Sequence, residues 1–128
     1  MRAIDTNVVV RYLTGDDPEQ AARARNVVET GNVFVSTTVL LECEWVLRSV
    51  YGLAAEDAAS ALRAFSGLPG VTVESPNLLV DALDRAAKGM DFADALHLGV
   101  AAHCETMLTL DRDFIRTARD ESPEVAEP

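Results

Sequence analysis

The chain has 128 residues, the usual size of one compact domain, and carries 11 Lys and Arg against 21 Asp and Glu, a formal net charge of −10. Hydrophobic residues make up 48% of the sequence, which excludes a disordered polyelectrolyte and predicts one domain with its own packed core. The negative balance argues against a protein that grips nucleic acid by bulk positive charge. A polyanionic substrate would need another means of binding.

The chain offers no apolar stretch long enough for a membrane. The longest stretch without a charged side chain runs from Thr30 to Leu41, 12 residues, against the roughly 20 that a spanning helix needs. Asp5 follows Met1 too closely for an apolar secretory leader to fit before it. We therefore expect no membrane helix and a cytoplasmic protein. Cys43 and Cys104 are expected to be buried free thiols.

Strand-like and helical patterns alternate along the chain. Residues 1–5 form a short apolar run that turns at Asp5 into a helix closed by Gly15, and Asp17 starts a second helix that stops at Gly31. Further helices are expected over residues 37–51, 54–65, 77–88 and 91–103, and further strands over 33–36, 71–74 and 106–110. This order predicts an α/β fold with a parallel sheet covered by helices and a site at the carboxyl ends of the strands.

The end of the chain is polar and acidic. Residues 124–126 either add an edge strand or belong to a frayed tail, and the sequence leaves both open. We therefore assign the domain to residues 1–119 and an acidic C-terminal tail to residues 120–128.

Two aspartates directly follow predicted strands. Asp5 ends the first strand and Asp111 comes after the last apolar one, so in a parallel sheet both project from the same edge. The alternative for each is a simple N-cap for the helix that follows. Two acids at equivalent strand ends weaken that alternative.

The helix that begins at residue 37 or 38 carries two glutamates with different expected surroundings. At about 100° per residue, Glu42 lies at the margin of the core stripe, held against apolar packing. Glu44 and Arg48 fall on the opposite face, at the i,i+4 spacing of an exposed ion pair. The expected core stripe consists of Val39, Cys43, Val46 and Val50.

Two more acids lie in the first turn of the helix predicted over residues 91–103. Asp91 and Asp94 are i,i+3 neighbours and repel each other, which the positive end of the helix dipole relieves only in part. Asp94 lies beside the apolar stripe that includes Ala95 and Leu98, and it is expected to face inward. The alternative is that the two are only surface acids at a helix start, and this alternative fits Asp91 better than Asp94.

Four inward or edge-facing acids from four elements predict an oxygen-ligand cluster. Such a concentration of negative charge needs hard divalent cations, and carboxylates with waters are the ligands that Mg²⁺ or Mn²⁺ prefers. One or two such ions could activate a water and stabilise charge on a transferring phosphate. Zinc is disfavoured because the histidines and cysteines have no ligand-pair spacing. The cluster comprises Asp5, Glu42, Asp94 and Asp111, with Asp91 and Asp113 as outer candidates.

Four short motifs follow one another at characteristic positions: DTNV at 5–8, LECEWVL at 41–47, DFADALH at 91–97 and LTLDRDF at 108–114. In order and spacing they resemble the PIN-domain ribonucleases, specifically the VapC-type toxins of prokaryotic toxin–antitoxin pairs, over residues 1 to about 116. The resemblance implies a PIN-like three-layer α/β/α fold with a central parallel sheet of four to five strands. It also implies a metal-dependent endoribonuclease, the toxin of a type II pair.

The resemblance also implies roles for single residues and partners. Asp5, Glu42, Asp94 and Asp111 take the positions of the catalytic, metal-holding acids, with Mg²⁺ as the ion and Mn²⁺ as its substitute. Activated water then cuts an RNA phosphodiester and leaves a 5′-phosphate and a 3′-hydroxyl. The family further suggests a homodimer neutralised by a small VapB-type antitoxin. Acids are also common in this family at Asp91 and Asp113, and polar residues that line the site match Thr6, Asn7 and Thr109.

Arginines near the predicted sheet edge are candidates for RNA contacts, namely Arg112 and Arg116 beside Asp111, and also Arg11. Their alternative is solvated surface charge. The segment 115–120 departs from the family because it lacks the Gly and apolar run that usually lead into a last strand. That departure puts the C-terminal strand in doubt, and not the site.

Two other functions remain as alternatives. A catalytically silent PIN-like module kept for binding or scaffolding would predict loss of the acids, which this chain retains. A phosphatase with an aspartyl nucleophile would want a second acid two residues after Asp5, where Asn7 stands. The net charge fits the nuclease, since the excess acids are the six of the predicted site and the four of the tail. RNA affinity should therefore depend strongly on the metal.

Overall fold

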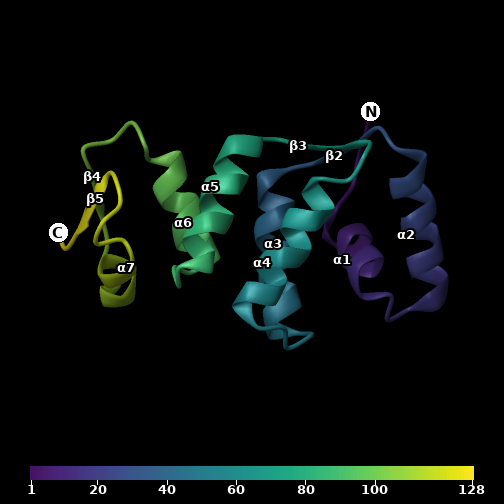
Figure 1. Ribbon diagram of the computed structural model, residues 1–128, viewed down its shortest axis with the longest axis horizontal. Coiled ribbons are helices and arrows are strands. Elements are labelled where there is room, and N and C mark those ends of the chain that lie inside the picture. Colours follow the sequence, from purple (N-terminus) through teal and green to yellow (C-terminus); the bar gives the residue numbers. More distant parts are fainter. The chain divides into compact units, whose positions relative to one another are not determined.

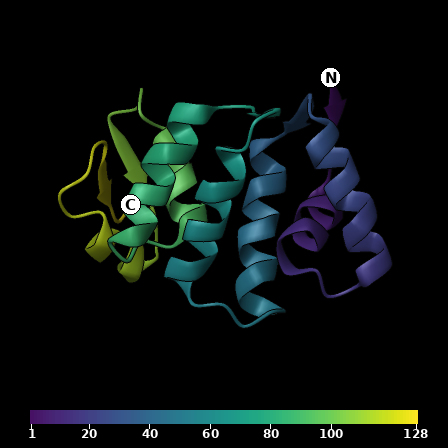
Figure 2. The same ribbon diagram turned by 45° about the vertical axis from the view of Figure 1, so that its right-hand side comes forward.

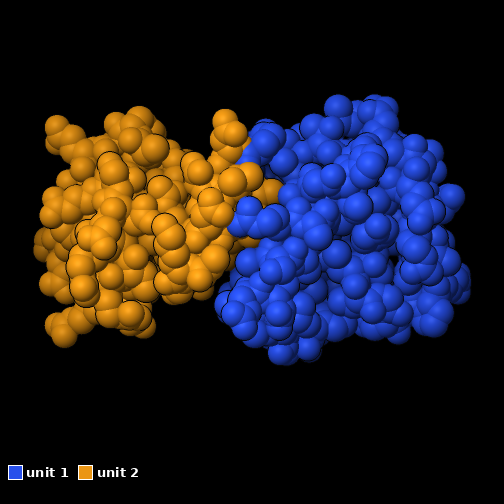
Figure 3. All heavy atoms as spheres, viewed as in Figure 1, with its two compact units in different colours: residues 1–76 blue, residues 77–128 orange.

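The computed structural model describes residues 1–128 and divides the chain into two compact units (Figure 3). Unit 1 is Met1–Pro76 and unit 2 is Asn77–Pro128. Seven helices and five strands alternate along the chain (Figure 1), and every strand pair is parallel. The predicted α/β class with parallel strands is confirmed. None of the helices has the length and apolarity needed to cross a membrane.

Unit 1 builds a three-stranded parallel sheet in the order β1-β2-β3. Val33 in the middle strand stands opposite Arg2 on one side and Val71 on the other. Helix α1 packs against α2 and α3, and α3 packs against α4, as the two ribbon views agree (Figure 2). The elements are β1 (Arg2–Ala3), α1 (Thr6–Thr14), α2 (Pro18–Thr30), β2 (Val33–Val35), α3 (Thr37–Ser49), α4 (Ala55–Ser66) and β3 (Val71–Val73).

The helix starts of unit 1 lie where their capping residues predict. Asp5 caps α1, since its Oδ1 accepts a hydrogen bond from the Val8 N–H at 3.3 Å. Asp17 caps α2 in the same way, and Pro18 occupies the first helical position. The predicted turn from strand to helix at Asp5 is therefore confirmed.

The core face of α3 differs from the predicted stripe. Val39 and Val46 are only half-buried and Val50 is 66% exposed, whereas Leu40 and Leu47 are buried together with Cys43. The apolar run 39–41 and the apolar pair 46–47 allow two helical stripes that differ by one residue. The structure buries the leucine stripe, because the larger side chains remove more apolar surface from water.

Two glycines let β2 and β3 begin side by side. Gly70 has φ of +80°, and a Cβ at this position would lie only 2.7 Å from the Cα of Gly31. A side chain at residue 70 would therefore meet both backbone strain and a backbone collision. Hydrogen bonding reinforces this approach, since the Val33 N–H donates to the Gly70 carbonyl at 2.9 Å.

Unit 2 pairs its two short strands in parallel, with Met107 opposite Val125. The open alternative for residues 124–126 is thus resolved as a strand. Helices α5 and α6 approach closely at Gly99, where a Cβ would collide with Leu78 Cδ1. The elements are α5 (Pro76–Ala87), α6 (Phe92–Val100), β4 (Thr106–Leu108), α7 (Arg112–Thr117) and β5 (Glu124–Ala126).

Two expectations differ in detail. The five parallel strands form a sheet of three in unit 1 and a sheet of two in unit 2, where a single central sheet of four to five strands was expected. Helix α6 ends at Val100, three residues before the predicted end. Cys104 therefore falls in the turn that follows and is exposed, while Cys43 is a buried free thiol as expected.

Candidate functional site

In unit 1, Asp5 and Glu42 lie around the buried residue Thr6. The Thr6 hydroxyl donates a short hydrogen bond to Glu42 Oε1, although the two residues are 36 positions apart in the sequence. Asp5 uses one carboxylate oxygen to cap α1 and is exposed. The predicted roles of Asp5 as strand-end acid and as helix cap are thus compatible, because a carboxylate has a second oxygen.

The two glutamates of α3 have surroundings opposite to those predicted. Glu42 is exposed, whereas Glu44 is buried with 3% of its surface accessible. Arg48 neutralises Glu44 with a bidentate contact, in which Nε lies 2.6 Å from Oε2 and Nη2 lies 2.9 Å from Oε1. The expectation of an exposed Glu44–Arg48 pair was wrong for Glu44, because the core stripe of α3 lies one residue away from the predicted one.

The surroundings of the Cys43 thiol, which include Asp5 and Glu42, raise its pKa. Burial, together with the carboxylates of Glu42 and Asp5, raises the pKa of Cys43 to about 12, against the lowering effect of its hydrogen bond with Thr6. Cys43 is therefore a protonated, inert thiol at neutral pH. The Cys43 side chain fills space in the core of unit 1.

Asn7 and Arg11, on the α1 side of unit 1, line a pocket of about 450 Å³. The guanidinium of Arg11 is held by its own unit, since Nε donates to Gln20 at 2.8 Å and Nη1 reaches Asp16 at 3.1 Å and Tyr51 at 2.9 Å. The role of Arg11 in RNA binding stays a prediction. The pocket is lined by Asn7, Val8, Arg11, Gln20, Arg23, Ala24 and Val27.

In unit 2, three predicted acids act on one another. Asp91 caps α6 by accepting from the Asp94 N–H at 3.2 Å. Burial raises the pKa of Asp94 above its usual value, the charges of Asp91 and Asp111 raise it further, and His97 lowers it. Asp94 is half-buried, in agreement with the inward position expected for it.

Asp111 stands at the point where β4 leads into α7. Its Oδ1 accepts from the Asp113 N–H at 2.9 Å and from the Phe114 N–H at 3.3 Å, while its own N–H donates to Thr109 Oγ1 at 3.0 Å. Thr109 therefore fixes the backbone that presents Asp111. Asp113 is 85% exposed and faces Arg116 on its own helix.

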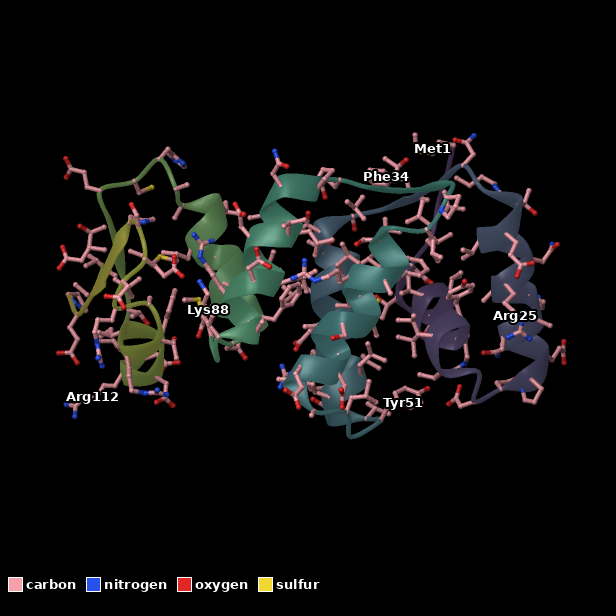
Figure 4. The ribbon with its side chains drawn as sticks, viewed as in Figure 1. Met1, Arg25, Phe34, Tyr51, Lys88 and Arg112 are labelled. Carbon is pink, nitrogen blue, oxygen red and sulfur yellow. The ribbon has the colours of Figure 1, made fainter.

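The predicted RNA-binding arginines of α7 are free to reach solvent. Arg112 is 91% exposed and extends away from the helix (Figure 4), with Glu127 at 3.7 Å as its nearest acid. Arg116 is 62% exposed, with Asp113 at 3.4 Å. Such exposed pairs hold their side chains only weakly.

The donor set suits a hard divalent cation. Each unit presents carboxylates beside neutral oxygen groups, and in unit 2 the acids Asp91 and Asp111 disfavour the charged form of Asp94, which a bound cation would reverse. Within either unit, no three His, Cys, Asp or Glu side chains converge closely enough to hold a metal ion. In unit 1 Thr6 bonds Glu42, and the charges of Asp5 and Glu42 both act on Cys43. In unit 2 the charges of Asp91 and Asp111 both act on Asp94.

Sequence reasoning placed Glu44 on the wrong face and gave Lys88 no role. The i,i+4 spacing of Glu44 and Arg48 predicted their ion pair. The burial of Glu44 was missed because the wrong apolar stripe of this helix was assigned to the core. Lys88, the only lysine of the chain, gave no motif and acquires meaning only from the pocket that it lines.

Comparison with protein families matches the PIN domain to residues 3–120. Comparison with curated proteins finds no match.

Proposed function

Because the chain belongs to the PIN-domain family, whose members are typically nucleases that use a divalent metal, we propose that it is a metal-dependent endoribonuclease. The observation that carries the proposal is the state of Asp94. This half-buried carboxylate has a pKa raised by burial and by the charges of Asp91 and Asp111, and no lysine or arginine contributes to it. His97 offsets these effects only in part, so the charged carboxylate still costs stability, which fits a group retained to hold a cation.

As the family resemblance implies, the acids proposed to hold the metal are Asp5, Glu42, Asp94 and Asp111. When bound, Mg²⁺ or Mn²⁺ would help to activate the attacking water and to balance the charge that develops on the phosphate. The chain's own contribution is to fix the carboxylates. Thr6 orients Glu42 by its hydrogen bond, and the capping of α7 orients Asp111.

Water is the proposed nucleophile for in-line attack on the phosphodiester of RNA, with a 5′-phosphate and a 3′-hydroxyl as products. Asp91 and Asp113 are proposed as additional acids of the site. Asn7, Thr6 and Thr109 are proposed to line it, in the manner that the resemblance implies. Thr109 supports this role through its contact with the Asp111 backbone.

The test is cleavage of a panel of structured RNAs in Mg²⁺, in Mn²⁺ and in EDTA, with the product ends mapped. We expect cleavage with either ion and none in EDTA, and loss of cleavage in Asp5→Ala and Asp94→Asn. Asp81→Asn, which removes an exposed acid of α5, is the matched control and should cut normally. Equal cleavage in EDTA would overturn the proposal, and so would a fully active, properly folded Asp94→Asn. Binding of RNA without any cleavage would favour the silent binding module.

We also propose that the protein is the toxin of a type II pair, acts in the cytoplasm as a homodimer and is neutralised by a small VapB-type antitoxin. The family resemblance supports this proposal. Trp45 of α3 is 56% exposed and Val50, just after the helix, is 66% exposed, apolar surface of the kind that partners cover. A short reading frame immediately upstream in the genome, whose product suppresses the cleavage, is the expected partner. A light-scattering mass of one chain at micromolar concentration would contradict the dimer.

A further inference from the structure

Unit 2 gathers all of its lysine and arginine side chains around two pockets. One pocket of about 520 Å³ is lined by Arg85, Lys88, Arg116 and Arg119, together with Thr117, Asp120 and Glu121. A second pocket of about 570 Å³ shares Arg116 and Arg119 with the first and adds Arg112. We call the two together the basic track. Its five cations are Arg85, Lys88, Arg112, Arg116 and Arg119.

The basic track lies in a unit whose total charge is negative. Residues 77–128 contain 11 Asp and Glu against these five bases. The pocket that holds Lys88 nevertheless has four basic residues and two acidic ones in its lining. An even mixture of the unit's charges would give an acidic lining, so this surface is locally positive within an acidic unit.

Two of the five cations have no ion-pair partner. Lys88 and Arg119 are exposed, and neither forms a salt bridge or a side-chain hydrogen bond in the structure. The other three are engaged to different degrees. Arg85 is the most enclosed, with 17% of its side chain exposed and Nε 3.2 Å from Glu121, while its Nη1 is buried without a hydrogen-bond partner.

We propose that the basic track binds successive phosphates of the RNA backbone. The proposal rests on the nuclease function and names the part of unit 2 that holds the substrate beside Asp111. Arg112 directly follows Asp111, and Arg116 lies about one turn further along α7, so the two cations stand beside that acid on one helix. Contacts of this kind fix the position of the backbone and carry no base sequence.

The test measures binding separately from cleavage. A short fluorescent oligouridylate is titrated with the full-length protein in EDTA, over a range of salt from about 50 to about 200 mM. Arg119→Gln and the double variant Lys88→Gln/Arg119→Gln are compared with the wild type. Arg25→Gln, at an exposed arginine of α2 in unit 1, removes the same charge outside the track and is the matched control (Figure 4).

We expect the double variant to bind about tenfold more weakly at about 0.1 M salt, with the slope of log affinity against log salt shallower by about 1.4, because two single-strand phosphate contacts are lost. Arg25→Gln should behave as the wild type. An unchanged slope in the double variant, an equal loss in Arg25→Gln, or no binding by the wild type at low salt would each overturn the proposal. Cleavage of the same RNA in Mg²⁺, measured in parallel, decides the nuclease function independently.

Discussion

The hydroxyl of Thr6 donates a hydrogen bond to Oε1 of Glu42, which ties the first turn of α1 to the middle of α3. Thr6 is buried with 8% of its surface accessible, while Glu42 is exposed. The bond from the buried Thr6 therefore holds the exposed Glu42 carboxylate in one orientation. Orientation is what a metal-holding carboxylate requires, since an outer partner that fixes a ligand supports both affinity and rate.

Thr6→Val tests this relationship, because valine keeps the shape of threonine and removes the donor. One hydrogen bond contributes about 1 kcal/mol, so we expect cleavage to fall about five- to tenfold and the metal concentration for half-maximal activity to rise. Thr14→Val is the control, since Thr14 bonds only within its own surroundings, to the Val10 carbonyl at 2.8 Å and to Asp16. A Thr6→Val protein with the metal dependence of the wild type would contradict a positioning role for Thr6.

Asp94→Asn should have opposite effects on activity and on the stability of the metal-free protein. Cleavage should fall by more than the roughly 10–100-fold that outer-shell partners of a metal cost. The folded state raises the pKa of Asp94 above the ordinary 3.8, so the native protein binds the proton more tightly than the unfolded chain does. Stability in EDTA therefore falls as pH rises from about 4 through the raised pKa, and an asparagine removes this loss.

The measurement is thermal unfolding in EDTA, at pH 7 and again near pH 3. We expect Asp94→Asn to melt above the wild type at pH 7 and level with it near pH 3, where Asp94 is protonated in both states. Asp81→Asn should show no such pH-dependent difference. A lower melting temperature for Asp94→Asn at pH 7 would mean that the carboxylate stabilises the empty site.

The sequence predicts where the helices begin and end better than it predicts which face of a helix is buried. Asp5, Asp17 and Gly15 act through backbone groups within four residues, and the helices begin and end where these residues predict. The face of α3 depends instead on which of two adjacent apolar stripes meets the rest of unit 1. That choice is made by tertiary packing, and it reversed the expected exposure of Glu42 and Glu44.

The acidic candidates illustrate the same division. Spacing and strand ends were enough to select Asp91, Asp94 and Asp111, which the structure of unit 2 brings near one another. The basic track has no sequence motif, because its cations come from α5, from α7 and from the segments that follow each of them. Residues assembled from separate elements become visible only in the folded unit.

The buried pair of Glu44 and Arg48 predicts a strong and specific cost. Arg48→Met leaves the Glu44 carboxylate, 4% exposed, without its bidentate partner. Breaking a buried pair typically costs 3–5 kcal/mol, and because Arg48 is itself 30% exposed we expect about 2 kcal/mol in denaturant unfolding. The double variant Glu44→Leu/Arg48→Met should recover most of that loss, since the buried Glu44 charge is removed together with its partner. Equal stabilities for Arg48→Met and the wild type would contradict the burial of Glu44.

The two cysteines should differ sharply in reactivity. Burial and the nearby carboxylates raise the pKa of Cys43 to about 12, so at pH 8 only about one thiol in 10⁴ is ionised. Cys104 is exposed in the turn after α6. Iodoacetamide at pH 8 should therefore modify Cys104 alone, as read by mass spectrometry of peptides, and the Cys104→Ser variant should react only once denaturant unfolds unit 1. Rapid labelling of Cys43 in the folded Cys104→Ser protein would contradict its burial.

Gly70 provides the sharpest test of how β2 and β3 meet. Gly70→Ala places a Cβ 2.7 Å from the Gly31 Cα and forces an L-residue to φ of +80°. Gly52→Ala is the matched control, because Gly52 has φ of +71° with nothing within 4 Å of the added Cβ. We expect about 1–2 kcal/mol of destabilisation for Gly52→Ala from the left-handed conformation alone, and at least about 1 kcal/mol more for Gly70→Ala from the collision. Equal unfolding free energies for the two variants would mean that the strands do not begin in contact.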